Sequence, residues 1–332
     1  MKPSTLLLTQ RDIAQLVDER VAIRAVRSAF EAMARGEAFM PSKVYLPLPR
    51  QSDFRAMPAF LQHPACCEIK WVNVHPENRR KRLPTVMALI VLNDPTTGVP
   101  LAVMDGLLVT KLRTAAAAAV AAQTLARPES HTVALVGCGA QADAQLQALA
   151  QLLTLSQANV WGFRRGEARA FAARMARRLP SVRVEPFETV EGCVAGADIV
   201  VTLTPSRRPL VQHSWLAPGV HVNAVGADGP GKQELEPNIL REATVVVDER
   251  EQAIHGGELN VPVARGEYDP ARIHATLGEI LIGRKPGRRS KGEMTVFDST
   301  GLAVHDIALG AEILRRARRR QIGRRIRFFE GL

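Results

Sequence analysis

This 332-residue chain lacks several features that mark particular classes of protein. No apolar run is long enough to span a bilayer, and the N-terminus has neither an extended apolar region nor a small-residue cleavage site. The four cysteines, at positions 66, 67, 138 and 193, have the spacing of neither a zinc site nor a disulfide framework. We therefore expect a cytoplasmic protein with reduced thiols, no membrane partner and no metal.

Acidic residues are too few to balance the basic ones, and the net charge is +11. Such an excess would suit a nucleic-acid-binding protein. More than half of it lies beyond residue 310, where eight arginines outnumber Glu312 and Glu330 and contribute +6. Apolar residues within and around this segment continue a helix and then resemble docking residues: Ile307, Leu309, Ile313, Ile326, Phe328 and Phe329. We interpret the arginines as the solvated face of a C-terminal helix and predict no nucleic-acid partner.

A dinucleotide-binding motif occupies residues 133–142. The apolar run 133–136 leads into Gly-x-Gly-x-x-Ala, and a helical pattern follows. Gly137 permits the tight turn, Gly139 lets a pyrophosphate approach the backbone, and Ala142 packs where a third glycine is usual. The helix N-terminus offers N–H groups and a partial positive charge to the phosphates. The alternative is a glycine turn in another kind of α/β protein.

The next strand, at 159–163, indicates which dinucleotide is bound. NAD-specific proteins usually end this strand with Asp or Glu, which bonds the ribose 2′-hydroxyl. Here Phe163 ends the strand and is followed by Arg164 and Arg165, two guanidiniums that suit a 2′-phosphate. We therefore expect NADP in preference to NAD. The alternative is that the two arginines are merely solvated residues at the start of the next helix.

Apolar periodicity divides the chain into segments of different character. Helical spacing covers about residues 5–35, an alanine-rich helix is expected at 110–125, and a further helix at 273–282. From residue 132, short apolar strands alternate with helices, which is typical of a buried parallel sheet. Residues 93–98 have the composition of a hairpin turn. The expected strands are 44–48, 68–73, 86–92, 100–104, 133–136, 159–163, 182–184, 199–203, 221–225, 244–247 and 294–297.

We predict an α/β fold with two domains. A Rossmann-type doubly wound parallel sheet domain, residues 116–302, is inserted into an α+β substrate-binding and dimerisation domain made of residues 1–115 and 303–332. The C-terminal helix is expected to pack back onto the N-terminal sheet. The cleft between the two domains is the default site for chemistry.

Four polar segments are not required by a core: 55–59, 69–76, 111–114 and 224–234. In the second, Lys70 lies in the middle of an apolar strand, where an unpaired ammonium is costly. It either reaches water at a strand edge or, as we favour, binds a carboxylate or polarises a carbonyl or imine. Arg113 at the start of the alanine-rich helix indicates an anion site.

The fourth segment is a glycine-rich loop that follows the fifth parallel strand. Ligands of open parallel sheets bind at this carboxyl edge. Asp228 in the loop is therefore a candidate general acid/base. The alternative is a residue that only forms the turn.

These segments together resemble the ornithine cyclodeaminase/mu-crystallin family over nearly the whole chain. The resemblance rests on residues 70–78, 83–87, 97–105, 113–116, 137–141, 223–232 and 297–301. Within the family, residues 204–209, 251–258, 274–279 and 326–329 are most similar to the archaeal-type alanine dehydrogenases.

The resemblance implies roles for particular residues. Lys70 and Arg113 would hold the substrate carboxylate, Lys43 stands where cyclodeaminases have a carboxylate-binding arginine, and Asp228 would be the acid/base. Further substrate-binding positions would be Arg55, Met57 and Thr300. The resemblance would place Thr85, Ala140, Gln141, Thr202, Val225, Lys232 and Ser299 against the dinucleotide. The other expected cofactor-binding positions are Arg113, Thr114, Gly137, Gly139, Gly226, Arg164 and Arg165. The last two are a departure from the family, because cyclodeaminases and archaeal alanine dehydrogenases are mostly NAD-type at this strand end. The resemblance also implies a homodimer through the N-terminal domain and a nicotinamide cofactor.

One departure from the family bears on the reaction. Cyclodeaminases carry a glutamate two residues before the Met-Pro, and this chain has Arg55 there. An arginine cannot accept a proton, but it could add a contact to a carboxylate. We therefore expect an NAD(P)H-dependent oxidoreductase on the C–N bond of small α-amino or α-imino acids, an alanine dehydrogenase or a ketimine or pyrroline-2-carboxylate reductase. The alternatives are an ornithine cyclodeaminase and an NADPH-binding protein of mu-crystallin type.

Overall fold

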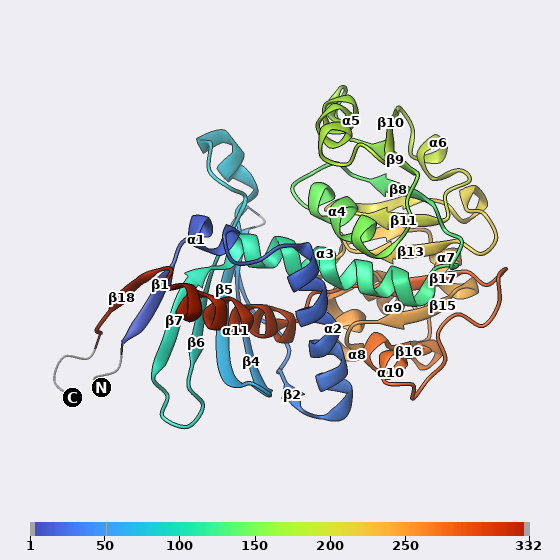
Figure 1. The fold of residues 1–332 in the computed structure, drawn as a ribbon. Coiled ribbons are helices and arrows are strands. Elements are labelled where there is room, and N and C mark those ends of the chain that lie inside the picture. Colours follow the sequence, from blue (N-terminus) through green and yellow to red (C-terminus); the bar gives the residue numbers. More distant parts are fainter. Residues whose placement is uncertain (1–3, 51, 329–332) are drawn as a thin grey trace. The chain divides into compact units, whose positions relative to one another are not determined.

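A computed structural model describes residues 4–50 and 52–328 of the chain (Figure 1). The chain forms two compact units. The first unit consists of residues 1–113 and 302–332, and the second of residues 114–301. The domain limits expected from the sequence lay at 115/116 and 302/303, within two residues of these.

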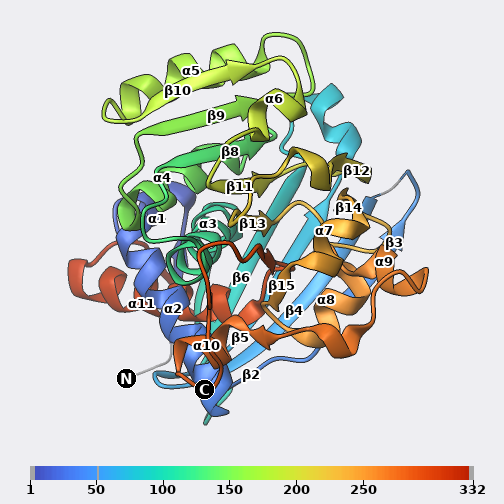
Figure 2. The ribbon, with the colours of Figure 1, turned by 90° about the vertical axis from the view of Figure 1, so that its right-hand side faces the viewer.

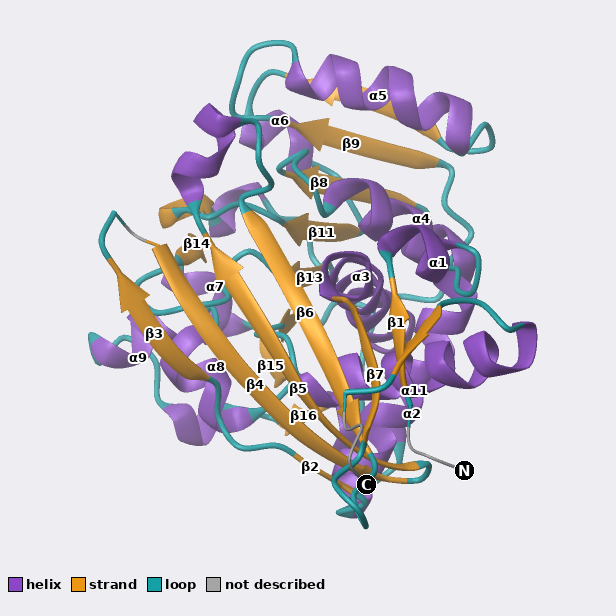
Figure 3. Ribbon diagram, turned by 90° about the vertical axis from the view of Figure 1, so that its left-hand side faces the viewer, coloured by secondary structure: helices purple, strands orange, loops and turns teal. Residues whose placement is uncertain are grey.

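The first unit is built on an eight-stranded mixed sheet, ordered β18-β1-β7-β6-β5-β4-β2 with β3 paired to β4. Figure 3 shows β3, β4, β5 and β6 side by side. Helices α2 and α11 pack together, and α11 also packs on β4, β5 and β6. The strands are Thr5–Leu8 (β1), Ala38–Phe39 (β2), Val44–Leu48 (β3), Ser52–Gln62 (β4), Ala65–Val74 (β5), Val86–Asn93 (β6), Pro100–Asp105 (β7) and Arg324–Ile326 (β18). The helices are Gln10–Ala14 (α1), Glu19–Arg35 (α2), Pro76–Lys81 (η1, a 3₁₀ helix) and Ala303–Arg320 (α11). Helix α3, Gly106–Leu125, belongs to this unit as far as Arg113.

Local sequence signals account for the helices of the first unit. Thr9 and Asp12 form a capping box at α1, and the Asp18 side chain caps α2 by accepting from the backbone of Val21. Gly36, in the left-handed conformation, ends α2. The hairpin turn expected at 93–98 is confirmed between β6 and β7, where Asp94 accepts from the backbone of Thr96 and Thr97.

Two expectations for the termini of the chain were wrong. Residues Thr5–Leu8 form β1 rather than the start of a helix, because their apolar side chains complete the sheet beside β7. The C-terminal helix ends at Arg320, and the next segment forms β18, which pairs antiparallel with β1. Ile326 lies in that strand, whereas Phe328 is 54% exposed and does not dock. Phe329 lies outside the described residues.

The alanine-rich helix α3 begins at Gly106, one turn earlier than expected. The Asp105 carboxylate accepts from the backbone N–H groups of Leu107 and Leu108 and so caps the helix. Arg113 therefore lies two turns inside α3. The expected anion site made by Arg113 and a helix N-terminus is wrong, because the free N–H groups of a helix belong to its first turn.

The second unit contains an eight-stranded parallel sheet, ordered β10-β9-β8-β11-β13-β17-β15-β16, with β12 and β14 as a separate pair. Figure 2 shows β9, β8, β11 and β13 in succession. The strands are Thr132–Val136 (β8), Gln157–Trp161 (β9), Arg183–Phe187 (β10), Ile199–Thr202 (β11), Arg207–Val211 (β12), His221–Ala224 (β13), Gln233–Leu235 (β14), Thr244–Val247 (β15), Ala275–Thr276 (β16) and Thr295–Asp298 (β17). The helices are Ala142–Leu152 (α4), Glu167–Arg178 (α5), Val190–Val194 (α6), Pro237–Glu242 (α7), Arg250–Gly256 (α8), Asn260–Ala264 (α9) and Leu277–Leu281 (α10), with 3₁₀ turns His213–Trp215 (η2) and Pro270–Arg272 (η3).

This sheet confirms the predicted doubly wound α/β class. The inner strands β8, β11, β13, β17 and β15 are buried along almost their whole length, which is what a parallel sheet covered by helices requires. The helix expected at 273–282 is shorter than predicted, because residues 275–276 extend the sheet as β16 and only the following turn is helical. In the described part of the chain, no helix is long and apolar enough to cross a membrane.

Candidate functional site

A buried ionic cluster lies inside the first unit. The Nζ atom of Lys70 on β5 lies 2.5 Å from Oδ2 of Asp306 on α11, and Nε of Arg113 on α3 lies 3.3 Å from Oδ1 of the same carboxylate. Lys70 is 1% exposed, Arg113 6% and Asp306 0%. One carboxylate thus holds two cations, and we call these three residues the cation cluster.

The sheet register explains why Lys70 points inward. Lys70 faces Met57 on β4 and Ile90 on β6, and Ile90 faces Met104 on β7. All four side chains belong to one buried row under α11. The alternative that Lys70 snorkels at a strand edge is therefore excluded, since β5 is an inner strand of the sheet.

Two further titratable groups adjoin the cation cluster. Glu68 precedes Lys70 on the same face of β5 and is 5% exposed, and His305 is fully buried beside Asp306 on α11. Burial and then the negative charge of Asp306 raise the pKa of Glu68 well above its ordinary value. Burial lowers the pKa of Lys70 to about 8, against the opposing effect of Asp306. Burial and then the two cations lower the pKa of His305, whose ring packs on Phe30 at 4.3 Å.

The remaining expected substrate positions of the first unit, Arg55, Met57 and Lys43, lie on or just before strands β4 and β3. Arg55 is buried on the inner face of β4, and its Nε and Nη2 atoms donate to Asp53 at 2.8 and 3.1 Å. Its guanidinium also lies 5.2 Å from the ring centre of Tyr45. Met57 is buried, whereas Lys43 is half-buried just before β3. The charge of Arg55 is thus already balanced by a carboxylate.

The dinucleotide motif of the second unit forms the expected strand, turn and helix. Gly137 ends β8 with φ of +114°, and its N–H donates to the carbonyl of Trp161 at the end of β9. A Cβ at this position would also lie 3.1 Å from Thr204, which is a tight contact, so the backbone conformation requires glycine and the space favours it. A Cβ at Gly139 would meet nothing within 4 Å, which leaves the turn before α4 open to a ligand.

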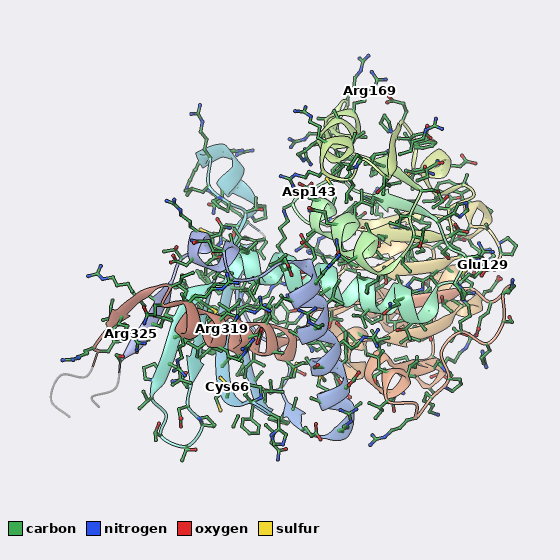
Figure 4. All side chains as sticks on the ribbon, in the orientation of Figure 1. Cys66, Glu129, Asp143, Arg169, Arg319 and Arg325 are labelled. Atoms are coloured by element: carbon green, nitrogen blue, oxygen red, sulfur yellow. The ribbon has the colours of Figure 1, made fainter. Side chains whose placement is uncertain are left out.

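A basic hollow lies beside the end of β9. Its volume is about 390 Å³, and its wall includes Arg164, Arg165 and Arg169 together with Glu188. Glu188 pairs with Arg169 at 2.9 Å, so the positive charges outnumber the negative one. Arg169 is labelled on α5 in Figure 4. The three arginines can therefore bind an anion such as a phosphate.

Asp228 lies in the loop after β13, at the carboxyl edge of the sheet. The ammonium of Lys232 donates to Asp228 Oδ1. The side chain of Asp228 is 37% exposed and that of Lys232 is 21% exposed, so both border solvent. The expected cofactor contact Lys232 and the expected acid/base Asp228 are therefore partners of each other in this structure.

A buried carboxylate underlies this loop. Glu234 accepts from the backbone of Gly226 at 3.0 Å and from the backbone and hydroxyl of Thr204 at 2.7 Å. Burial raises the pKa of Glu234 to about 7 although these hydrogen bonds act in the opposite direction. A Cβ at Gly226 would lie 2.4 Å from Glu234 Oε2, so only glycine permits the bond. Glu258 in turn accepts from the backbone of Glu234 and Leu235.

Four other expected cofactor and substrate positions lie at the same edge: Thr202, Val225, Ser299 and Thr300. Ser299 and Thr300 follow β17, and the Asp248 carboxylate accepts from the backbone and hydroxyl of Thr300 at 2.7 and 2.9 Å. Thr202 ends β11 and Val225 follows β13, with a hydrogen bond of 3.1 Å between their backbones. The remaining positions are Ala140 and Gln141 at the start of α4, Thr114 within α3 and Thr85 before β6. Thr85, in the first unit, accepts from the backbone of His75.

Sequence reasoning missed seven buried carboxylates: Glu68, Asp198, Glu234, Asp248, Glu258, Asp298 and Asp306. A signal for one of them was present, since Glu68 lies two residues before Lys70 on the same face of an apolar strand. Asp306 also interrupts the apolar face of a helix. Neither signal identifies the partner, because 236 residues separate Lys70 from Asp306.

Known proteins share both the sequence pattern and the fold of this chain. The pattern of the ornithine cyclodeaminase/mu-crystallin family matches residues 4–321. An alanine dehydrogenase from Archaeoglobus fulgidus is 46% identical over 98% of this chain and 99% of that protein. A solved archaeal alanine dehydrogenase dimer with bound NAD superimposes with a TM-score of 0.93 at 45% identity, covering 98% of this chain and all of that one. The Thermococcus litoralis delta(1)-pyrroline-2-carboxylate reductase, solved with NADH and L-proline, has a TM-score of 0.94 at 33% identity over 97% and 100% of the two chains.

Proposed function

The chain belongs to the ornithine cyclodeaminase/mu-crystallin family, and from this membership we propose that it is an NAD(P)H-dependent oxidoreductase acting on the C–N bond of a small α-amino or α-imino acid. Alanine and pyruvate are the first substrate pair, and cyclic imino acids such as pyrroline-2-carboxylate are the second. The observation that carries the proposal is the buried pair of cations Lys70 and Arg113 in a chain that also has the dinucleotide turn at Gly137.

Lys70 and Arg113 bind the substrate carboxylate in this proposal. Two cations that share a single carboxylate, Asp306, leave one positive charge in a region from which water is excluded. A buried positive charge is costly unless an anion joins it. A substrate carboxylate supplies that anion through charge-assisted hydrogen bonds. The cluster thereby orients the α-carbon of the substrate.

Asp228 moves the proton at the substrate nitrogen. Its carboxylate borders solvent at the carboxyl edge of the parallel sheet, where ligands of such sheets bind. Lys232 donates a hydrogen bond to this carboxylate, and Glu234 below the loop accepts from the backbone of Gly226 and holds it in place. General acid–base transfer of this kind contributes about 10²- to 10⁴-fold to a rate.

The residues of the second unit suit a dinucleotide. The open turn at Gly139 and the N-terminus of α4 receive a pyrophosphate, and the nicotinamide supplies the hydride. The hollow with Arg164, Arg165 and Arg169 receives a ribose 2′-phosphate, which favours NADPH over NADH. The solved relatives contain NAD or NADH, so this preference is a property we propose for this chain.

A homodimer through the first unit is supported by the outer face of its sheet. Val44, Ala56, Trp71 and Leu89 form one row across β3, β4, β5 and β6 on the face opposite Lys70. Val44 is 63% exposed, Trp71 42% and Leu89 56%. Apolar exposure on this scale favours a protein partner. A second copy of the chain fits, because a solved relative is a dimer.

Arg55 argues against the cyclodeaminase alternative. It pairs with Asp53 and cannot accept a proton, which disfavours the amine chemistry of an ornithine cyclodeaminase.

We also propose a cytoplasmic location. The four cysteines are free thiols, which supports this proposal.

The deciding experiment follows the absorbance of NADPH or NADH with purified protein, pyruvate and ammonium, and in parallel with pyrroline-2-carboxylate. We expect oxidation of the cofactor, faster with NADPH. Release of ammonia from ornithine without net change in nicotinamide would instead establish a cyclodeaminase. Tight NADPH binding without turnover of any oxo acid, imino acid or ornithine would establish a binding protein.

A further inference from the structure

Glu68 is a buried carboxyl group that the proposed mechanism does not use. Neither of its oxygens has a hydrogen-bond partner in the part of the chain that the structure describes. The residues opposite it on the flanking strands, Ala59 on β4 and Leu92 on β6, are apolar. An ionised carboxylate in such a place would lose its hydration and gain no hydrogen bond. The neutral form of Glu68, which carries a proton, avoids this cost.

The groups that face Glu68 come from three elements. Lys70 and the thiol of Cys66 lie on its own strand β5, Arg113 on α3, and Asp306 on α11. Asp306 opposes ionisation of Glu68, whereas Lys70 and Arg113 favour it. Asp306 makes hydrogen bonds to both cations, so the single negative charge is more stable on Asp306 than on Glu68.

We propose that Glu68 and Asp306 act as one carboxyl–carboxylate pair, which holds one proton and one negative charge and so sets the net charge of the cation cluster at +1. The part of this inference that concerns substrate rests on the proposed function. A net charge of +1 is neutralised by one substrate carboxylate. If Glu68 were ionised as well, the cluster would be neutral and a bound carboxylate would leave an uncompensated negative charge.

The charge of the pair also defines the substrate class. A monocarboxylic oxo or amino acid such as pyruvate or alanine leaves the buried cluster neutral. A dicarboxylic one brings a second negative charge, and the nearby Arg55 is already balanced by Asp53. We therefore expect kcat/KM for pyruvate to exceed that for oxaloacetate by at least about tenfold, which corresponds to about 1.4 kcal/mol.

Infrared difference spectroscopy of the full chain tests the shared proton without any substrate. At pH 7 we expect the carbonyl band of a protonated carboxyl group in the wild type that is missing from Glu68→Gln. The surface variant Glu251→Gln removes an exposed carboxylate and should leave this band unchanged. Identical bands in the wild type and Glu68→Gln would show that Glu68 is ionised and would overturn the proposal. Glu68→Met, an apolar replacement of similar volume, is the second variant if Glu68→Gln does not fold.

The Asp306→Asn variant tests whether the two carboxyl groups exchange the charge. Removal of the Asp306 charge leaves two cations beside Glu68, so Glu68 should ionise and its protonated band should disappear. The double variant Glu68→Gln/Asp306→Asn has no carboxylate left to offset either cation, so its cluster carries +2 and its KM for pyruvate should lie about tenfold below the value expected from the two single effects. A persistent Glu68 band in Asp306→Asn, or additive effects on KM, would refute the pairing. If no amino or oxo acid is turned over, the infrared results still decide the protonation, and only the proposed function fails.

Discussion

The Oδ2 atom of Asp306 lies 2.5 Å from the Nζ atom of Lys70, although 236 positions separate the two residues. The contact exists because α11, at the end of the chain, returns to cover the inner face of β4, β5 and β6. The C-terminal helix therefore supplies the anion that makes a buried lysine tolerable on β5. The candidate substrate site of the first unit therefore needs both β5, which carries Lys70, and α11, which carries Asp306.

Replacement of Lys70 by methionine tests this buried pair. Lys70→Met leaves Asp306 with Arg113 alone, and removing one member of a buried ion pair typically costs about 3–5 kcal/mol of unfolding free energy. We expect a loss at the lower end of this range in urea unfolding, because Arg113 still pairs with Asp306. Lys285→Met, on an exposed loop, should change the same quantity by less than about 0.5 kcal/mol. Equal stability of the two variants would contradict the role given to Lys70.

The double variant Arg164→Ala/Arg165→Ala tests the basic hollow. Loss of two guanidiniums should raise KM for NADPH at least about tenfold, since charge-assisted bonds to a phosphate are worth more than 1 kcal/mol each. KM for NADH should change by less than about twofold, because NADH has no 2′-phosphate. Steady-state kinetics with both cofactors is the measurement. Arg177→Ala, an exposed position further along α5, serves as the control. Equal effects on both cofactors would exclude a 2′-phosphate site here.

Asp228→Asn tests the proton transfer. The amide keeps the shape of the side chain but cannot exchange a proton, so kcat should fall by about 10²- to 10⁴-fold. The affinity for NADPH, measured by fluorescence titration, should stay within a few-fold of the wild type. A small decrease in kcat would assign the acid/base role to another group. A large loss of NADPH affinity would mean that Asp228 and Lys232 chiefly shape the cofactor loop.

Protein stability should fall in mild acid because of buried histidines. Burial lowers the pKa of His221 from its ordinary 6.5 to about 3. Between these values the unfolded chain binds a proton at this position and the folded chain does not, so stability that is present above pH 6.5 is lost as the pH falls. This residue contributes a decline of up to about 1.4 kcal/mol per pH unit.

Urea unfolding at pH 7 and pH 5 of the wild type, His221→Gln and His255→Gln measures this effect. His221 bonds Thr295 at 2.9 Å and Asn223 at 3.1 Å, whereas the His255 side chain is 74% exposed. The decline between the two pH values should be smaller in His221→Gln than in the wild type. It should be unchanged in His255→Gln. The same decline in all three proteins would rule out His221 as its source.

A charged residue on the outer face of the first unit should separate the proposed dimer. Trp71→Asp places a carboxylate in the middle of the row that also contains Val44 and Leu89. We expect the mass in solution, followed by light scattering over a range of concentrations, to fall from dimer to monomer. Phe163→Asp makes the same kind of change at an 85% exposed aromatic of the second unit and should leave the mass unchanged. A persistent Trp71→Asp dimer would place the interface elsewhere.

Much of the second unit could be predicted because its signals are local. The turn at Gly137, its left-handed backbone and the alternation of apolar strands with helices each depend on neighbours within a few residues. Strands β8 and β15 begin and end within one residue of the predicted limits. The limits of α3 were less accurate, because its cap Asp105 also ends a strand and the alanine pattern does not show where the helix starts.

The sequence by itself determined the fold class, the dinucleotide turn and the presence of an unusual lysine on an apolar strand. Short-range sterics and side-chain period are sufficient for these, since each is a property of one continuous segment. Only the tertiary structure decided that Asp306 shares its charge with Lys70 and Arg113. Electrostatic energy in a buried site depends on distances of a few ångströms between side chains from different elements. Most of those distances exist only after sheet and helices have packed together.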